Sequence, residues 1–389
     1  MKKTQAFFSL GFRPFFLAAT LFSMIAMLAW GAVYLFNIQL SAFNYYPASI
    51  WHAHEMIFGY SMAVIAGFLL TAIKNWTGVQ TVNGNKLMAL LGLWILARAI
   101  PFMVNNGWVI AIIDGMFLPV LAICIAIPLM QAGNKRNYFM VLLIIIFSLL
   151  NITIHLELLG LIYGLMSIVI KISLYLIIGL VIVMAGRVFP MFSQNGVMKK
   201  YQVKRYQLVE KLAMPSYFLF MLIMVFVNNS TVILIASILV ASIHAMRLKG
   251  WYNPQIWQVP LVWVLHMSYL FIILGFIISA YSAFLPSLNF LALHVFSIGV
   301  LGTVTIGMIS RVSVGHTGRD LKNPPKTVKT IFILIILATL IRVILPLFQP
   351  SYYQWSVIIS GSLWSLAFLL FFLSYMKILI SPRPDGKPG

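Results

Sequence analysis

Long apolar stretches alternate with short polar segments along nearly the whole chain. A helix that crosses the hydrocarbon core of a bilayer needs roughly 20 mostly apolar residues in a row. The pattern predicts twelve such helices, at about 15–36, 50–73, 87–104, 109–130, 138–158, 161–186, 208–228, 231–248, 256–281, 288–310, 328–348 and 353–380. The predicted fold class is therefore all-α, a polytopic membrane protein with twelve transmembrane helices in a single membrane domain over residues 1–389.

Positive charge falls in alternate loops between these helices. The loops after the second, fourth, sixth, eighth and tenth helices carry Lys and Arg, whereas the other loops, such as VNNS and SAFLPSLN, carry no charge. Loops rich in Lys and Arg remain on the cytoplasmic side of a membrane. Both termini are therefore expected in the cytoplasm, and each even-numbered helix is expected to begin at the outer face.

Composition supports this class. Hydrophobic residues make up 62% of the chain and charged residues only 8%, whereas a soluble domain carries about 25% charged residues. The net charge of +20 lies largely in the basic loops, so it indicates membrane topology and not a nucleic-acid partner. The one cysteine, Cys124, predicts no disulfide framework. The sequence contains no Walker or Rossmann glycine pattern, so the function is expected among the helices.

Two of the predicted helices share a short pattern. In the second helix, His54 is followed by glycines five and thirteen residues later, and in the tenth helix His294 is followed by glycines at the same spacings. The sixth helix has a corresponding glycine, Gly179, but no histidine. Since these helices are four apart, the pattern predicts a threefold repeat of four-helix units, whose shared sites would lie between units. Chance similarity is the alternative, because glycine is frequent in membrane helices.

The second helix begins with the segment WHAHEMIFG. His52 and His54 are two positions apart, so their side chains point roughly 200° apart around a helix and cannot both face one iron atom. By this count one face carries His52 and Glu55, and the other carries His54 and Phe58. The two faces allow two roles, an axial heme ligand and either a second metal ligand or a hydrogen bond between helices.

Other ionisable residues in the predicted helices add candidates. His294 lies at the depth of the histidine pair of the second helix, His155 and Glu157 reach the same face, and His266 enters from the cytoplasmic side. Such groups are costly to bury in a membrane and normally serve a site, although a single histidine often only joins two helices by a hydrogen bond. Two imidazoles at matching depth in the bilayer can serve as axial ligands of a heme. Glycines beside them would let the flat heme ring approach the helix backbone.

Arg98 and Asp114 lie toward the outer ends of the third and fourth predicted helices. One interpretation is a buried ion pair between the two side chains. The other is that Arg98 holds a heme propionate, because a guanidinium group suits a planar carboxylate.

A recognisable combination of segments is spread over nearly the whole chain. These segments are 11–16, 51–56 with Gly59, 67–72, 75–78, 186–192, Trp263 with His266, 293–294 and 311–321. In this combination the chain resembles the NnrS family of bacterial membrane proteins. One departure is Ala97, where the family pattern has a glycine before the arginine that is kept here as Arg98. The resemblance implies a protein of the bacterial inner membrane that contains heme and copper and takes part in the response to nitric oxide.

Residues 52–58 follow the pattern His-Ala-x-x-Met-Ile-Phe, and His294 in the tenth predicted helix is followed by Ser297 and Gly299. In both respects the chain also resembles, more weakly, the catalytic subunit of heme–copper oxidases, whose low-spin heme lies between histidines of the second and tenth spans. This resemblance implies a heme held by His294 and His52, whereas the internal repeat favours His54 as the partner of His294. The oxidase has a further histidine where this chain has Ala292, and its copper-site histidine pair on the seventh span is missing. The oxygen-reducing centre is therefore not implied.

Together these resemblances predict a membrane redox enzyme that reduces nitric oxide at a heme b centre with electrons from quinol in the lipid bilayer. The alternatives are a non-catalytic heme or copper protein that protects or senses, and a transporter. No catalytic residue is assigned. The candidate ligands of heme and of a second metal, copper or iron, are His52, His54, His155, Glu157, His266 and His294, with Arg98 as the candidate for the propionate.

Overall fold

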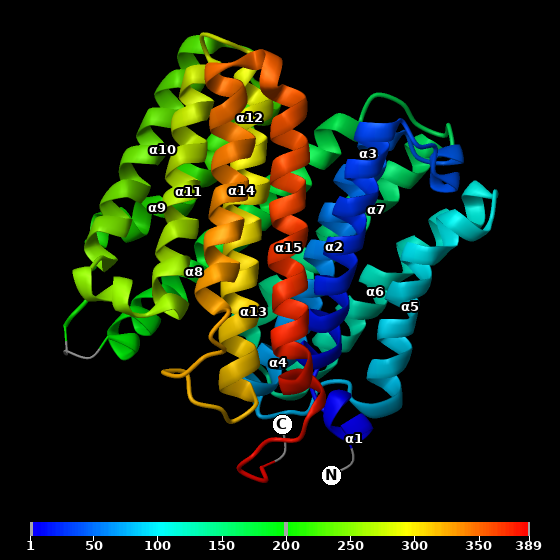
Figure 1. The fold of residues 1–389 in the computed structure, drawn as a ribbon, viewed down its shortest axis with the longest axis vertical. Helices are drawn as coiled ribbons and strands as arrows, with labels where there is room; N and C mark the ends of the chain where they lie inside the picture. Colours follow the sequence, from blue (N-terminus) through cyan, green and yellow to red (C-terminus); the bar gives the residue numbers. More distant parts are fainter. Residues whose placement is uncertain (1–2, 198–200, 388–389) are drawn as a thin grey trace. The chain divides into compact units, whose positions relative to one another are not determined.

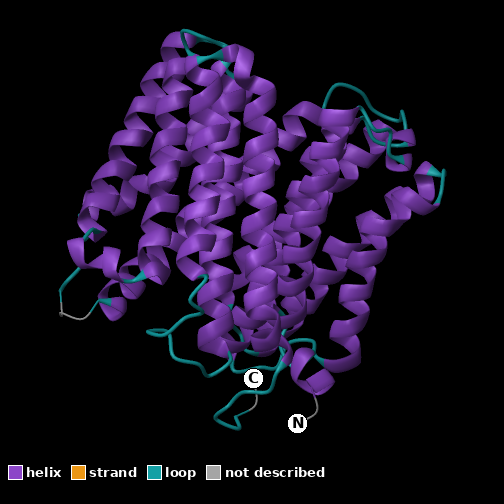
Figure 2. Cartoon of the chain, in the orientation of Figure 1, coloured by secondary structure: helices purple, strands orange, loops and turns teal. Residues whose placement is uncertain are grey.

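The computed structural model describes residues 3–197 and 201–387, and this part of the chain is helical without a strand (Figure 2). The twelve predicted spans are confirmed, because twelve helices are long and apolar enough to cross a membrane. The elements, labelled where space permits in Figure 1, are α1 Lys3–Phe7, α2 Phe12–Phe36, η1 Ser41–Asn44, α3 Ala48–His54, η2 Glu55–Ser61, α4 Met62–Thr77, α5 Gly84–Met103, α6 Gly107–Gln131, η3 Lys135–Asn137, α7 Tyr138–Leu158, α8 Met166–Gly196, α9 Gln207–Phe226, α10 Ser230–Trp251, η4 Pro254–Gln258, α11 Pro260–Ser282, α12 Leu288–His294, η5 Val295–Gly302, α13 Thr303–His316, α14 Val328–Phe348, η6 Pro350–Tyr352 and α15 Tyr353–Ile380.

The largest difference in boundaries concerns the sixth span. The sequence pattern ends this span at about residue 186, but α8 continues through Arg187 to Gly196. A charged residue marks the edge of the hydrocarbon layer. It does not end the helix, because the backbone hydrogen bonds of a helix form within the helix itself and persist beyond the bilayer.

The chain divides into two compact units. The first comprises Met1–Ser173, Val312–Asp320 and Phe368–Gly389, and the second comprises Leu174–Arg311 and Leu321–Ala367. In the first unit the second span packs against α2 and α6, and in the second unit α11 packs against α10 and η5. The single membrane domain expected from the sequence stays a prediction.

The second and tenth spans share a local distortion. His54 is the last residue of α3 and is followed at once by the π-helix η2, and His294 is the last residue of α12 and is followed by the π-helix η5. A π-helical stretch has wider turns than an α-helix and is frequent at functional sites. The same distortion therefore follows the two histidines that share the sequence pattern, while the threefold repeat itself stays a prediction.

The glycines of this pattern serve side-chain packing within each unit. A Cβ atom added to Gly59 would lie 2.8 Å from Phe22 and 2.9 Å from a carboxylate oxygen of Glu55. One added to Gly299 would lie 2.9 Å from Thr339. Side chains thus fill the space beside both glycines, where the sequence pattern suggested room for a flat ring.

Arg13, in the GFRPFF segment, forms hydrogen bonds with the C-terminal end of α15 in the first unit. This side chain is fully buried, and its Nη1 donates hydrogen bonds of 2.7 Å to the carbonyl oxygens of both Leu379 and Ser381. The last carbonyl groups of a helix have no partner within the helix. Arg13 therefore satisfies groups at the end of α15 and ties α2 to the C-terminal segment.

We expect Arg13→Gln to lower the thermal stability of the detergent-solubilised protein. Hydrogen bonds to a charged donor contribute about 1.5–3 kcal/mol, and the buried carbonyl groups would lose them. The melting temperature, followed by size-exclusion chromatography after heating, measures this loss. Lys377→Gln, an exposed position on α15, is the control, and equal melting temperatures for the two variants would contradict the assigned role.

Candidate metal centre

His54 is fully buried at the end of α3, and both of its ring nitrogens face oxygen atoms. Nδ1 lies 3.1 Å from Oε1 of Glu55, the next residue in the chain. Nε2 lies 2.8 Å from Oδ1 of Asn151 on α7 and 3.3 Å from Oδ2 of Asp114 on α6. His54 thus joins three spans of the first unit.

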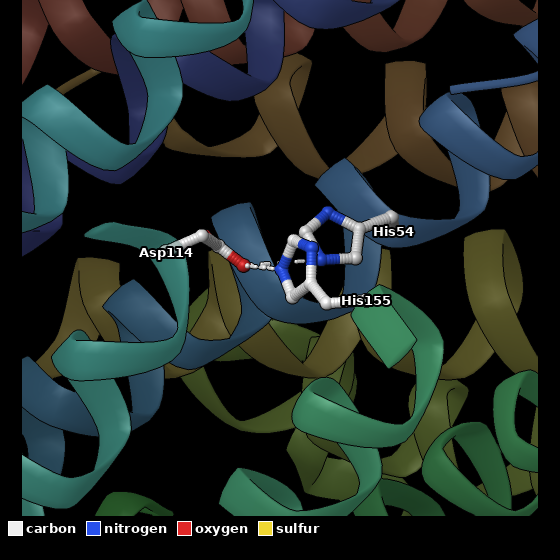
Figure 3. Close-up of side chains that lie close together, drawn as sticks. All are labelled: His54, Asp114 and His155. Atoms are coloured by element: carbon white, nitrogen blue, oxygen red, sulfur yellow. Dashed lines mark hydrogen bonds and ion pairs between the residues drawn. The ribbon is translucent and has the colours of Figure 1, made fainter. Parts of the chain in front are cut away.

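His155 on α7 lies on the other side of the same carboxylate. Its Nε2 is 2.8 Å from Oδ2 of Asp114, and Asn151 Nδ2 donates to that oxygen at 2.8 Å. One ligand atom each of His54, Asp114 and His155 lies within 4.8 Å of the others. Figure 3 shows the two imidazole rings and the carboxylate converging from three helices.

Arg98 on α5 binds both carboxylate groups of the cluster. Its Nη1 donates to both carboxylate oxygens of Glu55, at 2.7 and 2.8 Å, and its Nη2 forms an ion pair with Oδ1 of Asp114. One turn earlier on α5, Trp94 donates to the carbonyl oxygen of Gly59 in η2. The predicted ion pair between Arg98 and Asp114 is confirmed, and Glu55 joins it.

The formal charges of the residues in this cluster leave one negative charge uncompensated. Glu55 and Asp114 carry two negative charges, Arg98 carries one positive charge, and two neutral imidazoles add none. A net charge is costly in a buried membrane site. A further proton in the cluster or a bound cation would restore neutrality.

Tyr45, just after η1, connects the cluster to the loop between the first two spans. Its hydroxyl lies 2.9 Å from Nδ1 of His155, and the two rings stack with their centroids 5.9 Å apart. Burial raises the pKa of the Tyr45 phenol above its ordinary value, so the phenol stays protonated. The hydroxyl can therefore either donate to Nδ1 or accept a hydrogen bond from it.

Aromatic side chains enclose the cluster. The ring centroids of Tyr46 and Phe58 lie 5.1 and 5.2 Å from that of His54. Tyr46 also belongs to an apolar cluster with Trp51 and Ile110. Such surroundings have a low dielectric constant and strengthen every charge interaction within the cluster.

Two predicted site residues of the first unit lie outside the cluster. His52 is half-buried, and its ring stacks on Trp30 with the centroids 4.6 Å apart. Glu157 accepts hydrogen bonds of 2.7–3.0 Å from the backbone N–H groups of residues 164–166. Glu157 thus stabilises the turn that leads into α8, a common role for a carboxylate at a helix N-terminus.

The remaining predicted ligands belong to the second unit. Nδ1 of His294 lies 2.8 Å from the carbonyl oxygen of Phe290, and its Nε2 lies 3.3 Å from Nη2 of Arg342. Nδ1 of His266 lies 3.2 Å from the carbonyl oxygen of Val262. The pairing of His294 with a histidine of the second span stays a prediction.

Sequence reasoning missed several residues that the structure brings into polar clusters, among them Asn151, Tyr45 and His244. Asn151 and Tyr45 complete the cluster in the first unit, and His244 on α10 bonds the hydroxyl of Tyr269 at 2.6 Å in the second. A signal was present for Asn151, because it lies four residues before His155 and therefore on the same face of the helix. The sequence offered no comparable signal for Tyr45, which approaches from a loop.

Comparison with known families finds one match. The family model described as NnrS protein matches residues 6–383, a range that includes every residue of the cluster. No curated protein matches the chain.

We expect Arg98→Gln to destabilise the protein strongly. Removing one partner of a buried ion pair leaves an uncompensated buried charge and costs about 3–5 kcal/mol, and here two carboxylates would lose their cation. Adding Glu55→Gln to this variant removes one of those charges and should recover part of the loss. Melting temperatures of the single and double variants measure both effects, and a double variant less stable than Arg98→Gln would refute this charge balance.

Proposed function

Since this chain belongs to the NnrS family, membrane proteins of the nitric oxide response, we propose that it is a membrane redox enzyme that reduces nitric oxide with electrons from quinol. The observation that carries the proposal is the buried cluster of His54, Asp114 and His155, whose ligand atoms lie within 4.8 Å of one another. We infer that this cluster binds a copper ion.

The donor set fits copper. Two imidazole nitrogens and a carboxylate oxygen are ligands that suit copper or iron. In the cluster Oδ1 of Asp114 pairs with Arg98, which leaves Oδ2 as the oxygen that faces Nε2 of both His54 and His155. The charge of the cluster is also compatible with copper, because monovalent copper would make the cluster neutral.

The outer hydrogen bonds also fit metal binding. A histidine that binds a metal through Nε2 usually donates its Nδ1–H to a carboxylate or another acceptor, which fixes the ring orientation. Oε1 of Glu55 lies 3.1 Å from Nδ1 of His54, and the Tyr45 hydroxyl lies 2.9 Å from Nδ1 of His155. Both rings are therefore already held with Nε2 toward Asp114.

When bound, copper would supply a one-electron redox centre for nitric oxide. The chain itself orients both imidazoles through Glu55 and Tyr45 and holds Asp114 through Arg98. The Tyr45 hydroxyl gives His155 a hydrogen-bond connection toward the loop between the first two spans. The aromatic enclosure excludes water, which strengthens these interactions.

Heme b is the second cofactor that we propose, with His294 as a ligand. Nδ1–H of His294 donates to the carbonyl oxygen of Phe290, so iron would bind at Nε2, which lies 3.3 Å from Nη2 of Arg342 in the structure.

Copper content and nitric oxide consumption test the first part of this proposal. We expect about one copper per purified wild-type chain, and loss of most of it in His155→Ala, because two remaining ligands bind weakly. His52→Ala is the matched control and should keep the copper. Electrode measurements with a short-chain quinol should detect nitric oxide consumption in wild type and its loss in His155→Ala.

The outcomes separate the competing functions. Copper binding without consumption of nitric oxide would favour a non-catalytic protein that stores, senses or protects. Equal copper content in wild type and His155→Ala would refute the proposed ligand set. A protein without copper or heme would leave the transporter as the better hypothesis.

For heme we expect His294→Ala to lose most of the Soret absorbance of the purified protein, because an axial ligand would be missing. His316→Ala, at the end of α13 in the first unit, is the control and should keep the spectrum. An unchanged spectrum with full heme content in His294→Ala would remove His294 from the heme site.

A further inference from the structure

The second and tenth spans each pair their π-helix with an arginine on the following span. In the first unit Arg98 on α5 binds Glu55, the first residue of η2. In the second unit Arg342 on α14 lies beside His294, the residue before η5. A proline follows each arginine within its helix, at Pro101 and Pro346. The two arginines therefore occupy corresponding places in the two units.

The neighbours of the two arginines differ in charge. In the first unit Arg98 lies against the carboxylates of Glu55 and Asp114. In the second unit the position that corresponds to Glu55, directly after the histidine, is occupied by Val295. Hydroxyl groups of α15 lie beside Arg342, with Tyr353 at 2.9 Å and Ser356 at 3.4 Å.

Aromatic rings hold the guanidinium group of Arg342 in place. Its central carbon lies 5.1 Å from the ring centroid of Phe290 and 4.7 Å from that of Tyr353. The Arg342 residue is only 4% exposed, whereas His294 is half-buried. The imidazole is therefore the more exposed partner of a guanidinium group that is fixed and buried.

We propose that Arg342 and Tyr353 bind a carboxylate group of an amphiphilic ligand that lies beside His294. A guanidinium fork and a phenol hydroxyl are strong donors to a carboxylate, and Arg98 binds carboxylates at the corresponding place in the first unit. A carboxylate at Arg342 would also replace Nε2 of His294 as the acceptor for Nη2. Nε2 would then be able to bind a metal carried by the same ligand.

Two membrane-soluble ligands share this chemistry, a heme through its propionates and a fatty acid through its headgroup. The inference does not depend on the copper cluster or on nitric oxide reduction, because the contacts of the proposed ligand site lie within the second unit and Arg98 serves only as an analogy. Its heme form rests on the proposed heme site at His294. It differs from one of the two interpretations of the sequence, in which Arg98 holds a heme propionate.

The test is a set of binding titrations on the purified full-length protein. The ligands are hemin, hemin dimethyl ester, a fluorescent fatty acid and the corresponding fatty alcohol. Wild type should bind at least one carboxylate ligand about tenfold more tightly than its neutral counterpart, the effect expected for a charged hydrogen bond. Arg342→Gln should bind both members of that pair with similar affinity, and Arg342→Lys should recover part of the difference.

Arg311→Gln is the matched control. Arg311 is a buried arginine of the second unit that lies 4.0 Å over the ring of Phe192, and its substitution should preserve the discrimination. Melting temperatures show which variants are folded. If Arg342→Gln does not fold, the comparison of each carboxylate ligand with its neutral counterpart in wild type still tests the proposal.

Each outcome has a defined meaning. Discrimination with hemin only identifies a heme propionate as the ligand group, and discrimination with the fatty acid only identifies a lipid headgroup. Equal affinities in wild type for both pairs, or discrimination that persists in a folded Arg342→Gln, would overturn the proposal. Copper content and nitric oxide consumption are separate measurements, so failure here would leave the proposed function standing.

Discussion

The cost of burying charge in hydrocarbon governs both polar clusters at the histidines. A buried guanidinium group needs oxygen partners, because no water is present to solvate it. In the first unit Glu55 and Asp114 supply these partners to Arg98, and the same two carboxylates also orient His54 and His155. The arginine therefore fixes the geometry of residues that it does not touch, and its loss would disturb the whole cluster.

The π-helix η2 makes this arrangement possible. In a regular α-helix Glu55 would lie on the face of His52, about 100° from His54. In the structure Glu55 bonds both Arg98 and the adjacent His54. The wider π-helical turn changes the direction of the side chains along η2, so Glu55 can contact both its neighbour His54 and an arginine on the next span.

Both units have a π-helix directly after a histidine, but the chemical groups around it differ. Around Arg98 the carboxylates belong to the protein, so the cluster is self-contained and suited to a small cation. Around Arg342 the neighbours are hydroxyl and aromatic groups together with His294, so the corresponding place suits a carboxylate brought by a ligand. The difference begins with one substitution in the pattern, Glu55 in the second span and Val295 in the tenth.

Hydropathy alone determined the twelve spans, because the length of a spanning helix is set by bilayer thickness. The sequence also showed the ionisable residues of the predicted helices, and it offered the ion pair of Arg98 with Asp114 as one of two interpretations. Only the tertiary structure brought Asn151 and Tyr45 to His155, separated Glu157 from the cluster and placed Arg342 beside His294. Sequence spacing gives depth along a helix, but the contacts between helices depend on helix rotation, loop paths and π-helical turns, which packing of the whole unit decides.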